Sequence, residues 1–295
     1  MSTTPAVPEG RYADIGGGLR VHYQEAGQGA AVLFLHGSGP GASGYSNFRR
    51  NYPYVAAQGF RVIVPDTLGF GYSSKPDDVD YTLDYLAGAV ERLTRALGIG
   101  RCAIVGNSHG GAMAIQLALD HPELVSRLIL MAPGGLEVRE AYGKMEGIRT
   151  MMKVFLGPEG ITREGMRKVF GLQLFDPRTL TEEILDERME IAVTQPKRVL
   201  TSMVVPHLAP ELSRIRCPVF GFWGMNDKFC PVSGATTLAE RCPRSRVMLL
   251  SSCGHWVMVE HTDLFNRLSV DFLREAFLDE PASGPTPRAP AEPNA

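Results

Sequence analysis

Short runs rich in β-branched and apolar residues recur along the chain and alternate with longer segments of helical periodicity. From the third run onward they are almost continuously apolar, as expected for strands buried on both faces of a sheet. The predicted strands are 11–15, 19–24, 31–35, 60–64, 102–106, 127–131, 218–223 and 246–250. This alternation predicts an α/β fold with a mostly parallel, eight-stranded sheet and helices on both faces.

The clearest crossover helix is predicted at 82–97. Leu86, Val90 and Leu93 recur on one stripe of this segment, at the spacing of an amphipathic helix. Thr82 is a suitable N-cap, and Gly98 follows at a position that ends helices.

The alternation stops between residues 136 and 212, where only helical patterns occur. They cover 143–156, 163–171, 179–194 and 197–205. Thr179 and Glu182 have the spacing of a capping box. A helical insertion between two strands is most simply a lid. We therefore predict a core made of 11–135 and 213–278, interrupted by a helical lid at 136–212.

The two ends differ in composition from the rest of the chain. Residues 1–10 and 279–295 are rich in Pro, Ala and Ser and poor in bulky apolar side chains. Such segments bury too little apolar surface to offset the entropy of ordering. We expect both to be disordered tails.

Overall composition narrows the class of partner. Thirty basic and thirty-two acidic side chains give a formal net charge of −2, so no overall field attracts nucleic acid or a membrane surface. No apolar run approaches the roughly 18 residues of a membrane span, and the first residues lack the features of a signal peptide. The cysteines form no Cys-x-x-Cys pair, and no cluster has metal-ligand spacing. We expect a cytoplasmic protein with reduced thiols, a small-molecule substrate, and no metal or cofactor.

A nucleophile motif follows the strand predicted at 102–106. The sequence Gly-Asn-Ser-His-Gly-Gly occupies 106–111 and leads into an Ala-rich helical segment. Gly-x-Ser-x-Gly between a strand and a helix is typical of a nucleophile elbow, in which a sharp turn exposes the serine hydroxyl. The motif predicts that Ser108 is the nucleophile.

A serine hydroxyl needs a histidine to accept its proton and an acid to orient that histidine. His255 follows the last predicted strand and lies C-terminal to the serine, as the order Ser, acid, His requires. Asp227 follows strand 218–223 and is the predicted acid. Glu137 is the alternative acid, whereas Asp66 precedes the serine and is expected to shape the loop after its strand.

For the other histidines considered as the base, a structural or surface role is the simpler interpretation. They are His22, His121, His207 and His261.

A tetrahedral oxyanion needs two backbone N–H donors, one after the nucleophile and one from the loop after the third strand. His109 would supply the first. The glycine-rich segment after strand 31–35 would supply the second from Ser38 or Gly39. The same segment lacks the spacing of a phosphate-binding loop.

Taken together, these residues resemble the α/β-hydrolase fold and, within it, the meta-cleavage product hydrolases. Members of that family cut a carbon–carbon bond in ring-fission products of aromatic catabolism. The resemblance extends over about 11–277. The segments that carry it are 36–47, 106–111, 131–136, and 253–256 with 260–266.

The resemblance implies a 2-hydroxy-6-oxo-hexa-2,4-dienoate substrate with a substituent on the 6-oxo carbon. The products would be 2-hydroxypenta-2,4-dienoate and a carboxylic acid. Asn47 and Asn107 match family positions that contact the polar end of the substrate, and Trp256 would pack beside it. Arg188 matches the lid arginine of the family and would bind the carboxylate. Relatives in the family are often dimers or larger, so a homo-oligomer is possible.

Two residues depart from the family pattern. His109 stands where an apolar residue is expected, and Ser38 replaces a glycine. Both bear on substrate selectivity more than on reaction class. A carboxylesterase or lactonase using the same triad is the alternative function, and a non-enzymatic receptor is a third. The Met- and Phe-rich lid suits an alkyl or aryl substituent without charge.

Overall fold

Eight strands form one sheet in the order β1-β2-β4-β3-β5-β6-β7-β8 in the computed structural model, which describes residues 9–275. The pairs β1–β2 and β2–β4 are antiparallel, and the remaining pairs are parallel. The strands are β1 Arg11–Asp14, β2 Arg20–Ala26, β3 Ala30–Leu35, β4 Phe60–Pro65, β5 Cys102–Asn107, β6 Val125–Met131, β7 Val219–Gly224 and β8 Ser245–Leu250. The prediction of a mostly parallel, eight-stranded sheet is confirmed.

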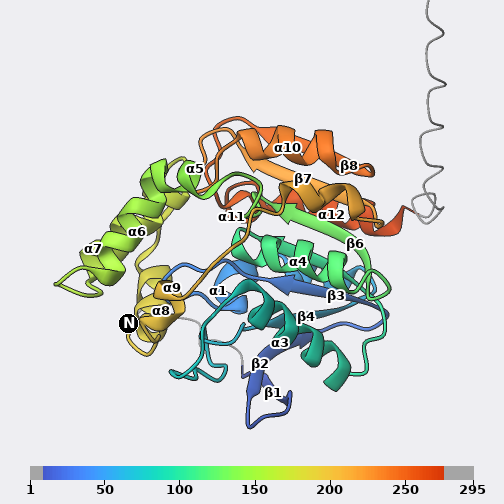
Figure 1. Cartoon of the computed structure of the whole chain (residues 1–295), viewed down its shortest axis with the longest axis horizontal. Helices are drawn as coiled ribbons and strands as arrows, with labels where there is room; N and C mark the ends of the chain where they lie inside the picture. The colour runs from blue at the N-terminus through green and yellow to red at the C-terminus, as the bar shows by residue number, and fades with distance from the viewer. Residues whose placement is uncertain (1–8, 276–295) are drawn as a thin grey trace, which may run out of the picture.

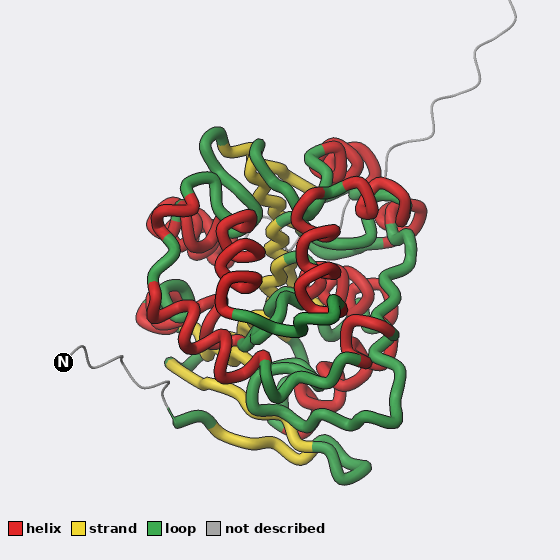
Figure 2. Tube along the Cα trace, turned by 90° about the vertical axis from the view of Figure 1, so that its left-hand side faces the viewer, coloured by secondary structure: helices red, strands yellow, loops and turns green. Residues whose placement is uncertain are grey.

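The central strands are buried on both sides because helices cover both faces of the sheet, as Figure 2 shows. In β3, Leu33 and Leu35 belong to one apolar core, while Val32 and Phe34 belong to the other. This alternation is the two-residue period of a strand. The strand β8 lies at the edge of the sheet and is only partly buried, unlike the predicted pattern of full burial.

The helices divide between the two faces. The first core includes side chains of α3 Leu83–Ala96, α4 His109–Asp120 and α10 Ser233–Arg241. The second includes those of α1 Gly44–Phe48, α2 Tyr52–Ala57, α11 Val257–Glu260 and α12 Thr262–Arg274. In α3 the Thr82 hydroxyl accepts a hydrogen bond from the Tyr85 N–H, which confirms the predicted N-cap.

Between β6 and β7 the described chain forms helices and no strand, and we refer to α5–α9 as the inserted helices. Figure 1 shows α6 to α9 gathered at one side of the sheet. Their bounds are α5 Arg139–Lys144, α6 Glu146–Leu156, α7 Arg163–Gln173, α8 Glu182–Ala192 and α9 Arg198–Thr201, with 3-10 turns at Pro177–Thr179 and Ala209–Arg214.

The helix predicted at 143–156 is interrupted. Met145 is extended and separates α5 from α6. The Gly147 N–H donates to the Lys228 carbonyl over 2.8 Å, and a Cβ at Gly147 would lie 2.5 Å from the Phe229 ring. The first turn of α6 is therefore fixed against the loop after β7.

Two further details of the insertion differ from prediction. Thr181, and not Thr179, caps α8, because Pro177–Thr179 forms a separate turn and the helix begins at Glu182. The helix predicted at 197–205 ends at Thr201. Beyond it Pro206 lacks an N–H and disfavours helical geometry in the residue before it.

The predicted tails lie outside the described residues, apart from Glu9 and Gly10. The same is true of residues 276–278 at the predicted end of the core. Over the described range, no helix is long and apolar enough to cross a membrane.

Candidate active site

Ser108 lies at a strained turn between β5 and α4. Its φ of 55° and ψ of −116° are unusual for a residue with a side chain. A Cβ at Gly106 would lie 2.5 Å from the Gly110 carbonyl oxygen, and a Cβ at Gly110 would lie 2.1 Å from that of Leu35. Only glycine fits at both positions, so the Gly-x-Ser-x-Gly spacing produces the elbow that the sequence predicts.

His255 and Asp227 form a buried hydrogen-bonded pair. The His255 Nδ1 lies 2.7 Å from Asp227 Oδ2. Asp227 Oδ1 accepts the N–H groups of Phe229 and Cys230 at 2.7 and 2.9 Å. The carboxylate is therefore held on both oxygens, which fixes the orientation of the imidazole.

Ser108 and His255 border one cavity of about 30 Å³. No hydrogen bond between their side chains occurs within the described residues. Behind the triad, burial beside Asp227 raises the pKa of the Cys230 thiol well above its usual range. The Ser108 hydroxyl must come within hydrogen-bond distance of His255 for proton transfer.

The predicted oxyanion donors border the same cavity or adjoin it. Ser38 and Gly39 line it directly. His109 is the first residue of α4, where a backbone N–H has no acceptor within the helix. The three residues are thus brought to the nucleophile, as the sequence predicts.

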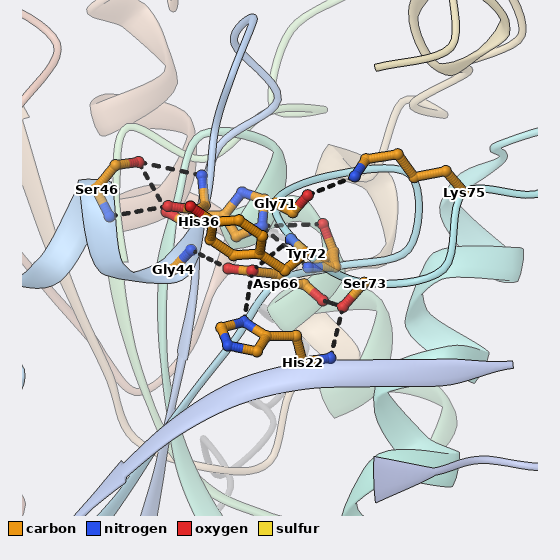
Figure 3. Close-up of polar contacts among 11 residues, drawn as sticks. His22, His36, Gly44, Ser46, Asp66, Gly71, Tyr72, Ser73 and Lys75 are labelled. Atoms are coloured by element: carbon orange, nitrogen blue, oxygen red, sulfur yellow. Dashed lines mark hydrogen bonds and ion pairs between the residues drawn. The ribbon is translucent and has the colours of Figure 1, made fainter. Parts of the chain in front are cut away.

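Asp66 anchors the loop that carries these donors. Its carboxylate accepts the N–H groups of Gly44 and Tyr72 at 2.7 and 2.8 Å and lies 2.8 Å from His22 Nδ1 (Figure 3). His36, at the start of the loop, accepts the Thr67 N–H at Nε2 over 3.0 Å and lies 2.7 Å from the Gly37 carbonyl through Nδ1. Acceptance at Nε2 requires neutral His36 with its proton on Nδ1, and burial lowers the pKa of this imidazole. Asp66 and His22 therefore have the structural roles expected of them.

A chain of polar contacts links the elbow to the inserted helices. Arg188 Nη2 donates to Asn47 Oδ1 over 2.7 Å, and Asn47 Nδ2 donates to Asn107 Oδ1 over 3.4 Å. Asn107 in turn donates to the Met131 carbonyl over 3.3 Å. The structure thus joins three of the four predicted substrate-binding side chains by hydrogen bonds, although they are far apart in sequence, and Trp256, the fourth, contacts Arg188.

Arg188 is almost completely buried, at 1% exposure. Its guanidinium carbon lies 5.2 Å from the ring centroids of both Phe170 and Trp256. No carboxylate pairs with it among the described residues. Burial lowers its pKa to about 10, so the group remains charged near neutral pH. The charge of the neighbouring Glu187 favours the charged form of Arg188, but Glu187 forms its ion pair with Arg49. A buried cation without an ion-pair partner of its own is costly.

A larger cavity of about 490 Å³ adjoins the first and shares Asn47 and Trp256 with it. Its lining includes Arg49, whose Nη1 donates to Glu187 over 2.8 Å. It therefore lies beside the Arg188 end of the site.

His109 is buried, and its Nε2 has no hydrogen-bond partner in the described part of the chain. Burial, together with the nearby His36, lowers its pKa to about 4. The imidazole is therefore neutral near pH 7.

Glu137, the alternative acid, forms no hydrogen bond with His255 among the described residues. Its carboxylate instead accepts a hydrogen bond from the Ser233 hydroxyl over 2.6 Å at the surface. Gln173 lines the cavity but has no role in the sequence prediction. The sequence feature that could have identified Gln173 is a polar side chain on the apolar stripe of α7, three residues after Phe170.

Such a site on this sheet defines a hydrolase of the α/β-hydrolase class. Residues 30–156 match the family model for the alpha/beta hydrolase fold. The chain is 40% identical over 265 residues to the 2-hydroxy-6-oxo-6-phenylhexa-2,4-dienoate hydrolase of Comamonas testosteroni, covering 86% of this chain and 91% of that protein. We conclude that the chain belongs to the meta-cleavage product hydrolases.

Two further similarities support this assignment. A 2-hydroxy-6-oxononadienedioate/2-hydroxy-6-oxononatrienedioate hydrolase of Comamonas testosteroni is 38% identical over 86% of this chain and 91% of its own length. The solved meta-cleavage product hydrolase of Pseudomonas fluorescens IP01 superimposes with a TM-score of 0.81 at 29% identity, covering 90% of this chain and 98% of that one. The predicted fold and family are confirmed.

Proposed function

We propose that this enzyme hydrolyses a carbon–carbon bond in a 2-hydroxy-6-oxo-hexa-2,4-dienoate, giving 2-hydroxypenta-2,4-dienoate and a carboxylic acid. The observation that carries the proposal is the buried, unpaired guanidinium of Arg188 in the cavity that holds Ser108 and His255. A substrate carboxylate would supply the missing charge, and the reacting carbon would reach the nucleophile.

The chemistry explains why the site needs a carboxylate-binding end. Direct cleavage would expel an unstabilised carbanion, so the dienol must first ketonise by moving its hydroxyl proton to carbon. The 2-oxo group then accepts the electron pair of the breaking bond as a dienolate. Arg188 and Asn47 would hold the carboxylate end during both steps.

In the cleavage step an oxygen nucleophile adds to the 6-oxo carbon. Either Ser108 forms an acyl-enzyme that water releases, or water adds directly with His255 as the base. In both routes His255 moves the proton, Asp227 fixes its tautomer, and backbone N–H groups of His109 and of Ser38 or Gly39 bind the oxyanion.

The inserted helices act as a lid in this proposal. Residues of α6, α7 and α8 line the 30 Å³ cavity, which is far smaller than the roughly 300–1,000 Å³ of ordinary ligand sites. These helices must move outward to admit a substrate. The adjoining cavity of about 490 Å³ beside Trp256 gives an entry path.

The proposal is tested by mixing purified enzyme with 2-hydroxy-6-oxo-6-phenylhexa-2,4-dienoate and following the loss of its visible absorbance. We expect a much higher kcat/KM than for a p-nitrophenyl ester, and loss of turnover in Ser108→Ala. A preference for the ester would instead identify a carboxylesterase or lactonase. No labelling of Ser108 by a fluorophosphonate, together with no turnover, would indicate a receptor.

Location and assembly are further parts of the proposal. The five cysteines are all buried free thiols, which suits the reducing cytoplasm. A homo-oligomer of two or more chains stays a prediction from the family. Cell fractionation and light scattering of the purified protein test these two points.

A further inference from the structure

Gln173 is a polar side chain on the buried face of α7. The other buried residues of that helix are Met166, Val169 and Phe170, all apolar. Gln173 is only 5% exposed, and its side-chain Oε1 has no hydrogen-bond partner among the described residues. Burying an amide oxygen without a partner is destabilising, so its presence in this apolar stripe requires an explanation.

The position of Gln173 places it beside the reacting centre. Its backbone carbonyl accepts hydrogen bonds from the N–H groups of His255 and Trp256 at 2.8 and 3.2 Å. Gln173 also lines the cavity that Ser108 borders. A ligand bound in that cavity is therefore the candidate partner for the amide.

Apolar side chains border the cavity beside His255. Phe229 stacks on His255 with a centroid distance of 5.2 Å, and the backbone of Gly147 in α6 packs against Phe229. Phe229 and Ile148 of α6 line the same cavity as Gln173. Arg188 donates to Asn47 and not to Gln173, so the amide serves a different part of the substrate.

The charge of the cavity restricts what that part can be. Within the described chain, Arg188 is the only Lys or Arg that borders the small cavity. A second carboxylate near Gln173 would be buried without a counter-charge. A hydroxyl or an aromatic amino group can donate to Oε1 and remain neutral, and a hydroxyl can also accept from the amide N–H.

We propose that Gln173 is a specificity-determining residue that binds a neutral O–H or N–H group on the substituent of the 6-oxo carbon. This inference rests on the proposed function and names its substrate class more narrowly. The preferred substrate carries a hydroxyl or amino group on its acyl side, in addition to the carboxylate that Arg188 binds.

The test compares kcat/KM for five dienoates that differ only in the substituent: phenyl, the 2-, 3- and 4-hydroxyphenyl isomers, and carboxyethyl. We expect the wild-type enzyme to favour one hydroxyphenyl isomer over phenyl by about tenfold or more, because the other substrates leave the amide unpaired. Gln173→Met should remove that preference. Gln116→Met is the matched control, since Gln116 bonds Asp120 outside the site, and it should retain the preference.

Gln173→Asn gives a second readout. It keeps an amide but shortens the side chain by one methylene, so the favoured hydroxyphenyl isomer should change. The backbone bonds to His255 and Trp256 are available in both variants, and thermal unfolding monitors their folding.

Equal kcat/KM for phenyl and every hydroxyphenyl isomer in the wild type would overturn this inference and leave the proposed function intact. The same holds if the preference survives in both Gln173 variants. A wild-type preference for carboxyethyl would also overturn it, by showing that the subsite takes an anion. Turnover of none of the dienoates would instead contradict the proposed function itself.

Discussion

The two ends of the candidate active site differ in how completely their polar groups are satisfied. At the triad end, Asp227 has partners on both oxygens, and its contact with His255 is short and buried. At the other end, Arg188 is buried with one hydrogen bond to Asn47 and two aromatic rings, without a counter-charge in the described chain.

Under the proposed function, this difference separates catalytic machinery from substrate recognition. A triad must be pre-organised before the substrate arrives, so its partners belong to the protein. A recognition group gains most from a ligand when it lacks an internal partner, and the protein bears the cost of leaving it unpaired. Arg188 Nε and Gln173 Oε1 both lack a hydrogen-bond partner among the described residues, and both residues come from the inserted helices.

The largest effect is expected at the satisfied end. Asp227→Asn should lower kcat by about 10³–10⁴-fold, because an amide favours the wrong imidazole tautomer. Steady-state kinetics with the phenyl dienoate measures this loss. Glu137→Gln is the control for the alternative acid and should keep wild-type kcat. The reverse ranking of the two variants would move the acid to Glu137.

At the unsatisfied end, Arg188→Met should separate activity from stability. We expect kcat/KM to fall by about 10²–10³-fold through loss of the carboxylate contact. The free energy of unfolding should rise by about 1 kcal/mol, because a buried, uncompensated charge is removed. Urea unfolding and kinetics measure the two quantities.

A matched control for this variant is Arg163→Met. Arg163 is exposed on α7 and pairs with Glu182 and Asp186, so both quantities should stay close to the wild-type values. If Arg188→Met destabilises the protein and leaves kcat/KM unchanged, Arg188 is a structural residue and the comparison between the two ends fails.

His109 gives a pH-dependent effect of intermediate size. The pKa of His109 is about 4 in the folded state and 6.5 in the unfolded state. Between these two pH values the unfolded state therefore binds more protons than the folded state. Wild-type stability is therefore lost on acidification. When the pH is lowered from 7 to 5, the free energy of unfolding of His109→Met should rise by about 2 kcal/mol relative to that of the wild type.

The same variant also tests the assignment of the base. Because His109 stays neutral well below pH 7, the acid limb of the pH–rate profile should persist in His109→Met. Disappearance of that limb would show that His109 titrates during catalysis and that His255 does not act alone.

The smallest effect concerns the helix that carries Arg188. Thr181→Ala should destabilise the protein by about 0.5–1 kcal/mol, since the Thr181 hydroxyl caps α8 at the Ile184 N–H. Thr179→Ala should cost less than about 0.5 kcal/mol, because Thr179 lies in the exposed preceding turn. Chemical unfolding measures the free energy of unfolding of both variants. Equal losses of stability would contradict the assignment of Thr181 as the N-cap of α8.

Much of the fold was predictable because its signals are local. Runs rich in β-branched and apolar residues, almost continuously apolar from the third onward, indicated the eight strands, and Thr82 indicated where α3 begins. The same local rules were wrong at Thr179 and at 197–205. There, proline geometry and hydrogen bonds to distant segments determine where the helices begin and end: the Leu83 N–H, for example, donates to the Val204 carbonyl over 3.3 Å.

The candidate site divides in the same way. The sequence by itself determined the elbow, since only glycine fits at 106 and 110, and it indicated Ser108, Asp227 and His255 through their order and their positions after strands. Only the tertiary structure decided that Arg188 is buried without a counter-charge, that His109 is neutral, and that Gln173 enters the cavity. These properties depend on burial and on partners up to 141 residues away in the chain, which local sequence does not specify.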